Sequence, residues 1–126
     1  MESNNLVLSP LGHTWIFDID GTVCKHNGYK IDGHDTILPG VMEFFEQIPE
    51  EDMVIFITSR TEEYRELTIE FLKESGLHYD HLIFNAPYGE RILLNDDKPS
   101  GMKCSVALNF KRNAGLSMNM TIDNNL

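Results

Sequence analysis

The chain places two aspartates one residue apart, directly after an apolar run. Asp18 and Asp20 stand in the stretch Phe-Asp-Ile-Asp-Gly-Thr, residues 17–22. Side chains two residues apart in a strand share one face, so the two carboxylates lie close together. Each anion raises the free-energy cost of ionising the other. The pair therefore favours a bound cation, or a reaction that uses two carboxylates, over a purely structural role.

Two further clusters of polar residues follow later apolar runs. One run ends at residue 57, and another, Arg-Ile-Leu-Leu-Asn, spans 91–95. The residues that follow are Thr58, Ser59 and Arg60 after the first run, and Asp96, Asp97 and Lys98 after the second. If the runs are parallel strands of one sheet, all three polar clusters meet at one edge of it, where ligands bind in such sheets.

These residue types are suited to phosphate chemistry. Mg²⁺ prefers oxygen ligands and keeps several waters, so Asp18 and Asp96 could hold one ion and leave a position for a phosphate oxygen. One aspartate of the pair could attack phosphorus and form an aspartyl-phosphate, while the other serves as general acid and then as base for water. Thr58 could donate a hydrogen bond to a phosphoryl oxygen, and Lys98 could neutralise charge in the transition state.

Short apolar runs indicate the strands that would position these groups. We expect strands at 13–17, 52–60, 81–84, 91–95 and 105–110. Only six residues separate 84 from 91, which is too few for the helical crossover that parallel strands usually need. Either 81–84 is not a regular parallel strand, or it forms a hairpin with 91–95.

Two helices are predicted between the strands. Residues 39–48 carry apolar side chains at the spacing of one helix face, and residues 61–76 show a longer stripe of the same kind. Ser59 and Glu62 have the spacing of a capping box, and Gly76 stands where a helix would end. Three segments are predicted to be irregular, namely a lead-in at 1–11, a flap-like loop at 22–38 and a tail at 113–126. Alternating strands and helices predict an α/β fold whose mostly parallel sheet is covered on both faces.

The motifs resemble those of haloacid-dehalogenase-type (HAD-like) hydrolases. Phe-Asp-Ile-Asp-Gly-Thr-Val is similar to their DxDGT signature, Val-Ile-Phe-Ile-Thr-Ser-Arg to their second motif, and Arg-Ile-Leu-Leu-Asn-Asp-Asp to their fourth. The resemblance covers residues 13–112. It implies a single domain over 1–126 with a Rossmann-like, three-layer HAD-type sandwich and no cap domain. The stretch from Glu90 onward resembles a small capless branch that often accompanies capsule or surface-polysaccharide biosynthesis.

The resemblance also implies a role for each acidic residue. Asp18 would be the nucleophile and a metal ligand, and Asp20 the general acid/base, binding Mg²⁺ through its backbone carbonyl. Thr58 would bind the phosphoryl group. Asp96 would be a metal ligand, and Asp97 a second ligand or a residue that supports one.

The basic residue of the family's third motif is left open, because no lysine stands between 77 and 95. Lys98 is assigned that role, with Arg91 and Lys73 as competitors. The residues expected to contact substrate are Gly21, Thr22, Ser59, Arg60 and Arg112, of which Arg112 could instead cap the edge of the sheet. The stretch 26–35 holds two histidines and two aspartates whose spacing fits no standard zinc site.

The expected function is therefore a Mg²⁺-dependent phosphomonoesterase acting on a sugar phosphate or a similar small phosphate ester. A nucleotide or polynucleotide 3′-phosphatase is the alternative within the enzyme class. A non-catalytic phosphoacceptor of similar fold is the alternative outside it. Asp20 distinguishes the enzyme from the phosphoacceptor, because a pure phosphoacceptor needs no second carboxylate to activate water.

Charge and composition limit the partners. The net charge is −10, from 20 acidic and 10 basic residues, which argues against binding to a nucleic-acid backbone. A small anionic substrate still fits, since a bound metal can invert the local field. We expect a small phosphorylated substrate, no membrane and no nucleic acid, and we leave a homo-oligomer open.

Three features favour a cytoplasmic location. No stretch reaches the roughly 18 apolar residues that a membrane span needs. The first residues lack the basic and apolar regions of a signal peptide. Cys24 and Cys104 form no CxxC pair, which is typical of unpaired thiols in a reducing compartment.

Overall fold

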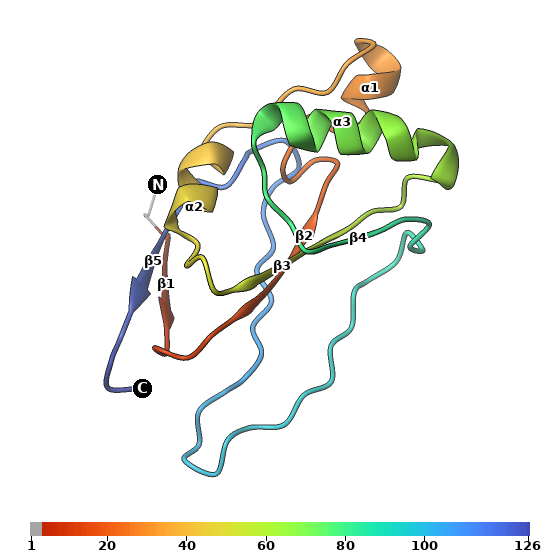
Figure 1. The fold of residues 1–126 in the computed structure, drawn as a ribbon. Helices are drawn as coiled ribbons and strands as arrows, with labels where there is room; N and C mark the ends of the chain where they lie inside the picture. The colour runs from red at the N-terminus through yellow and green to blue at the C-terminus, as the bar shows by residue number, and fades with distance from the viewer. Residues whose placement is uncertain (1–3) are drawn as a thin grey trace.

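The computed structural model describes residues 4–126 and shows an α/β protein in which every strand pairing is parallel (Figure 1). Its central sheet has the order β2-β3-β4. These strands are β2 (Thr14–Asp18), β3 (Met53–Ile57) and β4 (His81–Ile83). The predicted α/β class and parallel pairing are confirmed. Residues 81–83 form a parallel strand beside β3, and 91–95 forms no strand, so the hairpin between them is not present.

Two helices connect these strands on one side of the sheet. α2 (Val41–Gln47) joins β2 to β3, and α3 (Arg65–Ser75), preceded by the 3-10 helix η1 (Glu62–Tyr64), joins β3 to β4. The short α1 (Gly28–Ile31) lies within the predicted flap after β2. Figure 1 shows the helices on the same side, as two right-handed crossovers in one direction require. The prediction that helices cover both faces of the sheet is wrong for residues 4–126, because no helix follows α3 and the other face stays exposed.

The helix predictions hold, but one predicted cap does not. α2 and α3 lie inside the predicted ranges, and Gly76 ends α3 with a φ of 73°. Ser59 does not cap η1, because its Oγ donates to the Pro87 carbonyl at 3.4 Å. Of the helices in the described part of the chain, none has the length and apolar character to cross a membrane.

An aromatic core fills the space between the sheet and α2. Phe17 of β2 stacks on Phe45 of α2 with ring centroids 4.6 Å apart, and Phe56 of β3 is fully buried. Trp15, the only tryptophan, packs edge-on against α2 and donates its indole N–H to Asp52 at 2.9 Å. Trp15 and Phe17 share one face of β2, as residues two apart must.

The opposite side of the central sheet is apolar and open. Ile16 of β2 is 55% exposed, and Met53 of β3 and Ile83 of β4 are also exposed. These residues alternate with the buried ones along their strands. The sheet therefore buries one apolar face and leaves a second one uncovered.

The lead-in and the tail, both predicted to be irregular, form a second sheet. β1 (Asn4–Leu8) pairs in parallel with β5 (Met118–Ile122) along its whole length. Gln47 of α2 ties this pair to the domain, because its side chain donates to the Met118 carbonyl and accepts the Met120 N–H, each at 3.2 Å. Asparagine is depleted in strands, so these segments carry a weak strand pattern, and the partners lie at opposite ends of the chain.

The largest difference from the prediction is residues 87–109, which we call the arm. Strands were expected at 91–95 and 105–110, and neither forms. The arm leaves the body of the domain as an extended excursion and returns (Figure 1). Its backbone hydrogen bonds lie at the turn, where Lys98 N–H donates to Met102 and Gly101 N–H donates to Lys98.

Candidate active site

The ends of β2 and β3 lie side by side. Asp18 is the register partner of Ile57, so Thr58 follows at the same edge of the sheet. The Thr58 N–H donates to the Ile83 carbonyl of β4 at 2.9 Å, which joins the third strand to this edge. We call this edge the rim. Two of the three predicted polar clusters thus meet here.

The loop after β2 is a tight turn built on one carbonyl. The N–H groups of Thr22, Val23 and Cys24 all donate to the Ile19 carbonyl, at 2.9 to 3.2 Å. Gly21 has a φ of 85°, and a Cβ there would lie 3.1 Å from the Arg112 side chain. Only glycine fits this position without strain. The aspartate pair is therefore presented on a rigid turn.

The chain after the arm closes over this turn. Asn113 donates its N–H to the Gly21 carbonyl at 2.8 Å, and its side chain accepts the His26 N–H at 2.7 Å. Arg112 packs directly on Gly21. The structure therefore brings Arg112 to the predicted site, although no described side chain pairs with its charge.

Asp18 is the accessible carboxylate of the pair. Its side chain is 46% exposed, and it accepts a hydrogen bond from the Thr22 hydroxyl at 3.4 Å. Partial burial raises the pKa of Asp18, and Asp20 acts in the same direction, while the Ile19 N–H and Arg91 oppose them. Arg91 places its guanidinium 3.8 Å from the carboxylate. Of the three basic residues considered for the third motif, Arg91 is the one placed beside Asp18.

Asp20 points inward, where Arg60 binds it. Arg60 donates to both Asp20 oxygens at 2.9 and 3.0 Å and to both Asp35 oxygens at 2.7 and 3.1 Å. It also donates to the Thr68 hydroxyl at 2.9 Å and lies 4.0 Å over the Tyr29 ring. The Arg60 side chain is 1% exposed. Burial opposes its charge, but the two carboxylates outweigh that and raise its pKa.

This geometry corrects the prediction that Arg60 contacts substrate. A guanidinium with 1% exposure and bonds to two carboxylates has no free face for a ligand. Arg60 instead links three parts of the chain, which are the turn after β2, the segment that precedes α2, and helix α3. Its partner Asp35 was missed, since the sequence holds no pattern that joins positions 35 and 60.

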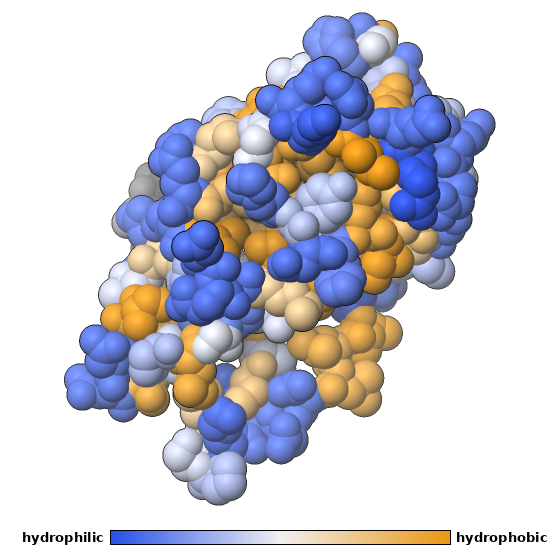
Figure 2. All heavy atoms as spheres, viewed as in Figure 1, coloured by the Kyte–Doolittle hydropathy of each residue, from blue (hydrophilic) through white to orange (hydrophobic). Residues whose placement is uncertain are grey.

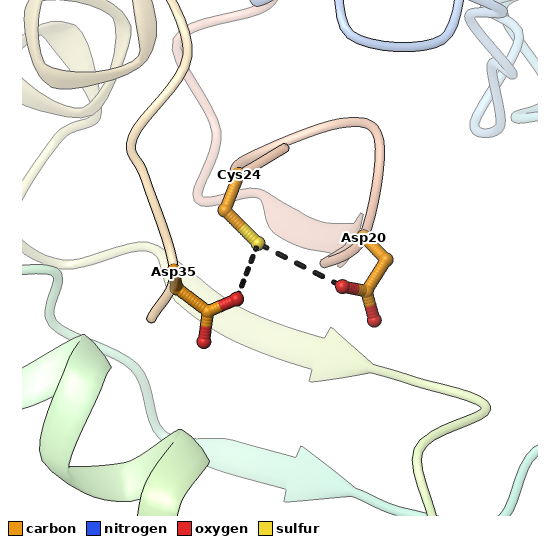
Figure 3. A group of neighbouring side chains, drawn as sticks. All are labelled: Asp20, Cys24 and Asp35. Atoms are coloured by element: carbon orange, nitrogen blue, oxygen red, sulfur yellow. Dashed lines mark hydrogen bonds between the residues drawn. The ribbon is translucent and has the colours of Figure 1, made fainter. Parts of the chain in front are cut away.

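Asp20, Cys24 and Asp35 lie close enough to form a metal site, with ligand atoms within 4.8 Å of one another. Figure 3 shows the Cys24 thiol pointing between the two carboxylates. Burial strongly raises the pKa of this thiol, and both aspartates add to the effect, so it stays protonated. Zinc binds the thiolate, and the cluster already contains the Arg60 cation. The group is a buried ion-pair network.

The third predicted cluster is not at the rim. Asp96, Asp97 and Lys98 lie on the arm and are exposed, and Asp97 pairs with Lys103 at 2.6 Å. Figure 1 shows the turn of the arm, in light blue, beyond the opposite end of the central strands. The prediction that Asp96 meets Asp18 at one edge of the sheet is therefore wrong for this structure, because 91–95 does not join the sheet.

Thr58 and Ser59 are at the rim but are not free. Thr58 is buried, and its hydroxyl accepts the Arg60 N–H at 3.0 Å. Lys73 lies in the last turn of α3.

A comparison of the chain with models of protein families, with curated proteins and with solved structures found no match.

Proposed function

We propose that this protein is a phosphomonoesterase of the HAD-like type, with Asp18 as the nucleophile. The observation that carries the proposal is the half-exposed Asp18 carboxylate at the carboxyl end of a parallel strand, beside the start of a rigid glycine turn. Ligands bind at this end of parallel α/β sheets. The DxDGT resemblance of residues 18–22 agrees with that position.

In this reaction an Asp18 oxygen attacks phosphorus, a new O–P bond forms, and the ester O–P bond breaks. Water then attacks the aspartyl-phosphate and releases inorganic phosphate. Arg91, 3.8 Å from Asp18, and Thr22, 3.4 Å from it, are the proposed ligands of the phosphoryl oxygens. Thr58 is proposed as a third donor, because its buried hydroxyl accepts the Arg60 N–H and keeps its own hydrogen for a phosphoryl oxygen at the rim.

Asp20 is the proposed acid and base, and Arg60 is its positioning residue. Both Asp20 oxygens accept hydrogen bonds from Arg60. One oxygen must leave Arg60 before Asp20 can give a proton to the leaving group or take one from water. Asp35 keeps Arg60 neutralised during that exchange, since it holds two of the Arg60 N–H groups.

The residues of one chain do not complete a Mg²⁺ site. Asp18 offers a carboxylate, and Asp20 offers a backbone carbonyl, but the Asp20 side chain is bound to Arg60. Asp96 and Asp97 lie on the arm. Mg²⁺ is bound through one or two carboxylates with substrate oxygens, in nearly octahedral geometry. The requirement for Mg²⁺ is thus a part of the proposal that the assay must test directly.

The decisive experiment measures hydrolysis of an aryl phosphate with and without Mg²⁺. We expect turnover that needs the ion, and a loss of about 10³-fold or more in Asp18→Asn. Asp123→Asn, beyond β5, is the matched control and should keep wild-type turnover. Equal turnover in wild type and Asp18→Asn would contradict the mechanism. A panel of sugar phosphates, nucleotides and phospholipid headgroups then identifies the substrate class, for which a sugar phosphate is proposed.

A non-catalytic phosphoacceptor is the second candidate, and the Arg60 contacts favour it. An aspartate whose two oxygens are held by a buried arginine is poorly placed to activate water. Asp20→Asn separates the two functions. In an enzyme this variant accumulates the aspartyl-phosphate, whereas in a phosphoacceptor the lifetime of the phosphate on Asp18 stays the same as in wild type.

A further inference from the structure

The arm presents an apolar surface of unusual extent for a small domain. Ile92 is 81% exposed and Leu94 is 87% exposed, and Leu93, Val106 and Leu108 are exposed as well. Figure 2 shows groups of hydrophobic residues below the body of the molecule, where the arm runs, with hydrophilic residues between them. Large contiguous apolar patches on a small protein mark interaction sites.

The backbone of residues 91–95 in the arm is also without backbone partners. Within residues 4–126, no backbone hydrogen bond pairs these five residues with another segment, whereas the turn beyond them is closed by bonds of Lys98 with Met102 and Gly101. The side chains of 91–95 still follow the pattern of a buried strand. The arm therefore carries both the apolar side chains and the free N–H and C=O groups that a strand uses when it joins a sheet.

The central sheet has a free strand edge to which such a segment can pair. β2 is the first strand of β2-β3-β4, so in the described part of the chain its outer edge pairs with nothing. An open strand edge is a template for pairing with another chain. Beside this edge lies the uncovered face of the sheet, with Ile16, Met53 and Ile83 exposed.

The total exposed area supports the same conclusion. The chain exposes 8565 Å². A compact monomer of 14.4 kDa exposes about 6,800 Å². The excess of about 1,700 Å² exceeds the roughly 800 Å² that each partner gives to a standard interface. A partner that covers the arm and the open face would bury enough area for a stable complex.

We propose that the partner is a second copy of this chain, and that the two copies exchange arms. The arm of each copy packs against the free β2 edge and the open sheet face of the other. Both halves of the interface are present on every chain, so a two-fold axis closes the assembly as a dimer.

The exchange also completes the site at the rim. A parallel pairing of 92–95 with β2, like every other pairing in the structure, leaves Arg91 at the site of its own chain and places Asp96 of the partner subunit beside Asp18. The two carboxylates that one chain keeps apart then meet across the interface. This part of the inference rests on the proposed function, whereas the dimer itself does not.

The first test is the mass in solution, by size-exclusion chromatography with light scattering. We expect twice the 14.4 kDa chain mass for wild type and a single chain mass for Ile92→Glu/Leu94→Glu. Ile31→Glu, on α1 and 69% exposed, is the matched control and should stay dimeric. Ile16→Glu, on the receiving face, should be monomeric. A monomeric wild type, or a dimer that survives the arm substitutions, overturns the proposal.

The second test is complementation between Asp18→Asn and Asp96→Asn. If each site takes Asp18 from one copy and Asp96 from the other, a mixed dimer contains one intact site. Equal co-expression makes half of the dimers mixed, so about a quarter of wild-type phosphatase activity should return. Activity no greater than that of the separate variants overturns the shared site. A wild type that hydrolyses no phosphate ester refutes the proposed function, while the mass measurement still decides the arm exchange.

Discussion

Arg60 holds together three parts of the chain that are far apart in sequence. Its guanidinium binds Asp20 after β2, Asp35 before α2 and Thr68 in α3. A buried charge is tolerated only when hydrogen bonds and opposite charges compensate it. Here Asp20, Asp35 and Thr68 all bind the same planar guanidinium. The position of Asp20 in the site is therefore set by a residue that does not itself face the solvent.

We expect Arg60→Lys to lower the free energy of unfolding by about 2–3 kcal/mol. Lysine keeps the charge but lacks the planar fork that reaches both carboxylates at once. Arg65→Lys is the matched control, because Arg65 pairs with Glu62 on the exposed side of η1 and α3, and its stability should stay close to that of wild type. Urea unfolding of both variants gives the comparison, and equal losses would contradict the role of Arg60.

The charge of Asp18, in contrast to that of Arg60, destabilises the fold. Its pKa is raised in the folded state, so stability falls as the pH rises from the ordinary pKa through the folded one. Asp18→Asn should therefore unfold at a slightly higher temperature than wild type at pH 7. The gain should be below about 0.5 kcal/mol, because the carboxylate is half exposed and screened. A lower melting temperature in this variant would contradict the account.

At the scale of elements, the apolar patterns of the sequence correctly predicted those strands and helices whose own side chains supply the buried core. β2, β3, α2 and α3 each carry a complete apolar pattern, and all four formed within about four residues of the expected bounds. The site residues carried on these elements, Asp18 and Thr58, were placed together correctly for the same reason.

The errors arise where a segment needs a distant partner. β1 and β5 have few strand-forming residues and gain their order from pairing across the whole chain. The arm has the opposite character, with a strand-like pattern and no strand. Apolar periodicity shows that a segment will be covered, but it does not say by which surface.

The junction between β2 and β3 predicts a dependence of stability on acid. Asp52, just before β3, accepts hydrogen bonds from Trp15 at 2.9 Å and from His13 at 2.7 Å. Burial alone would raise the pKa of Asp52, but the bonds from Trp15 and His13 outweigh it and lower the pKa from 3.8. An acid with a lowered pKa stabilises the fold above its unfolded pKa, and this contribution is lost as the pH falls through the folded value.

Asp52→Asn should therefore unfold more easily than wild type at pH 7, by about 1–2 kcal/mol. The difference should shrink as the pH falls below about 4. Urea titrations of both proteins across this range measure the gap. A gap that stays constant down to pH 2 would assign the loss to packing instead of ionisation.

At the scale of the whole molecule, the arm exchange predicts that stability depends on protein concentration. A dimer gains stability by mass action as the concentration rises, and a monomer does not. The melting temperature of wild type should increase with concentration, and that of Ile92→Glu/Leu94→Glu should remain constant. A wild-type melting temperature that is independent of concentration would contradict the exchange.

Trp15 provides a natural means of following these changes. It is the only indole in the chain, and it lies between the central sheet and α2, in contact with Phe17 and Asp52. Its fluorescence emission therefore reports the loss of the domain's interior, while release of the arm is a second event outside that interior. A label attached to Cys104, which is exposed on the arm, would report the second event, so one sample can time the two separately.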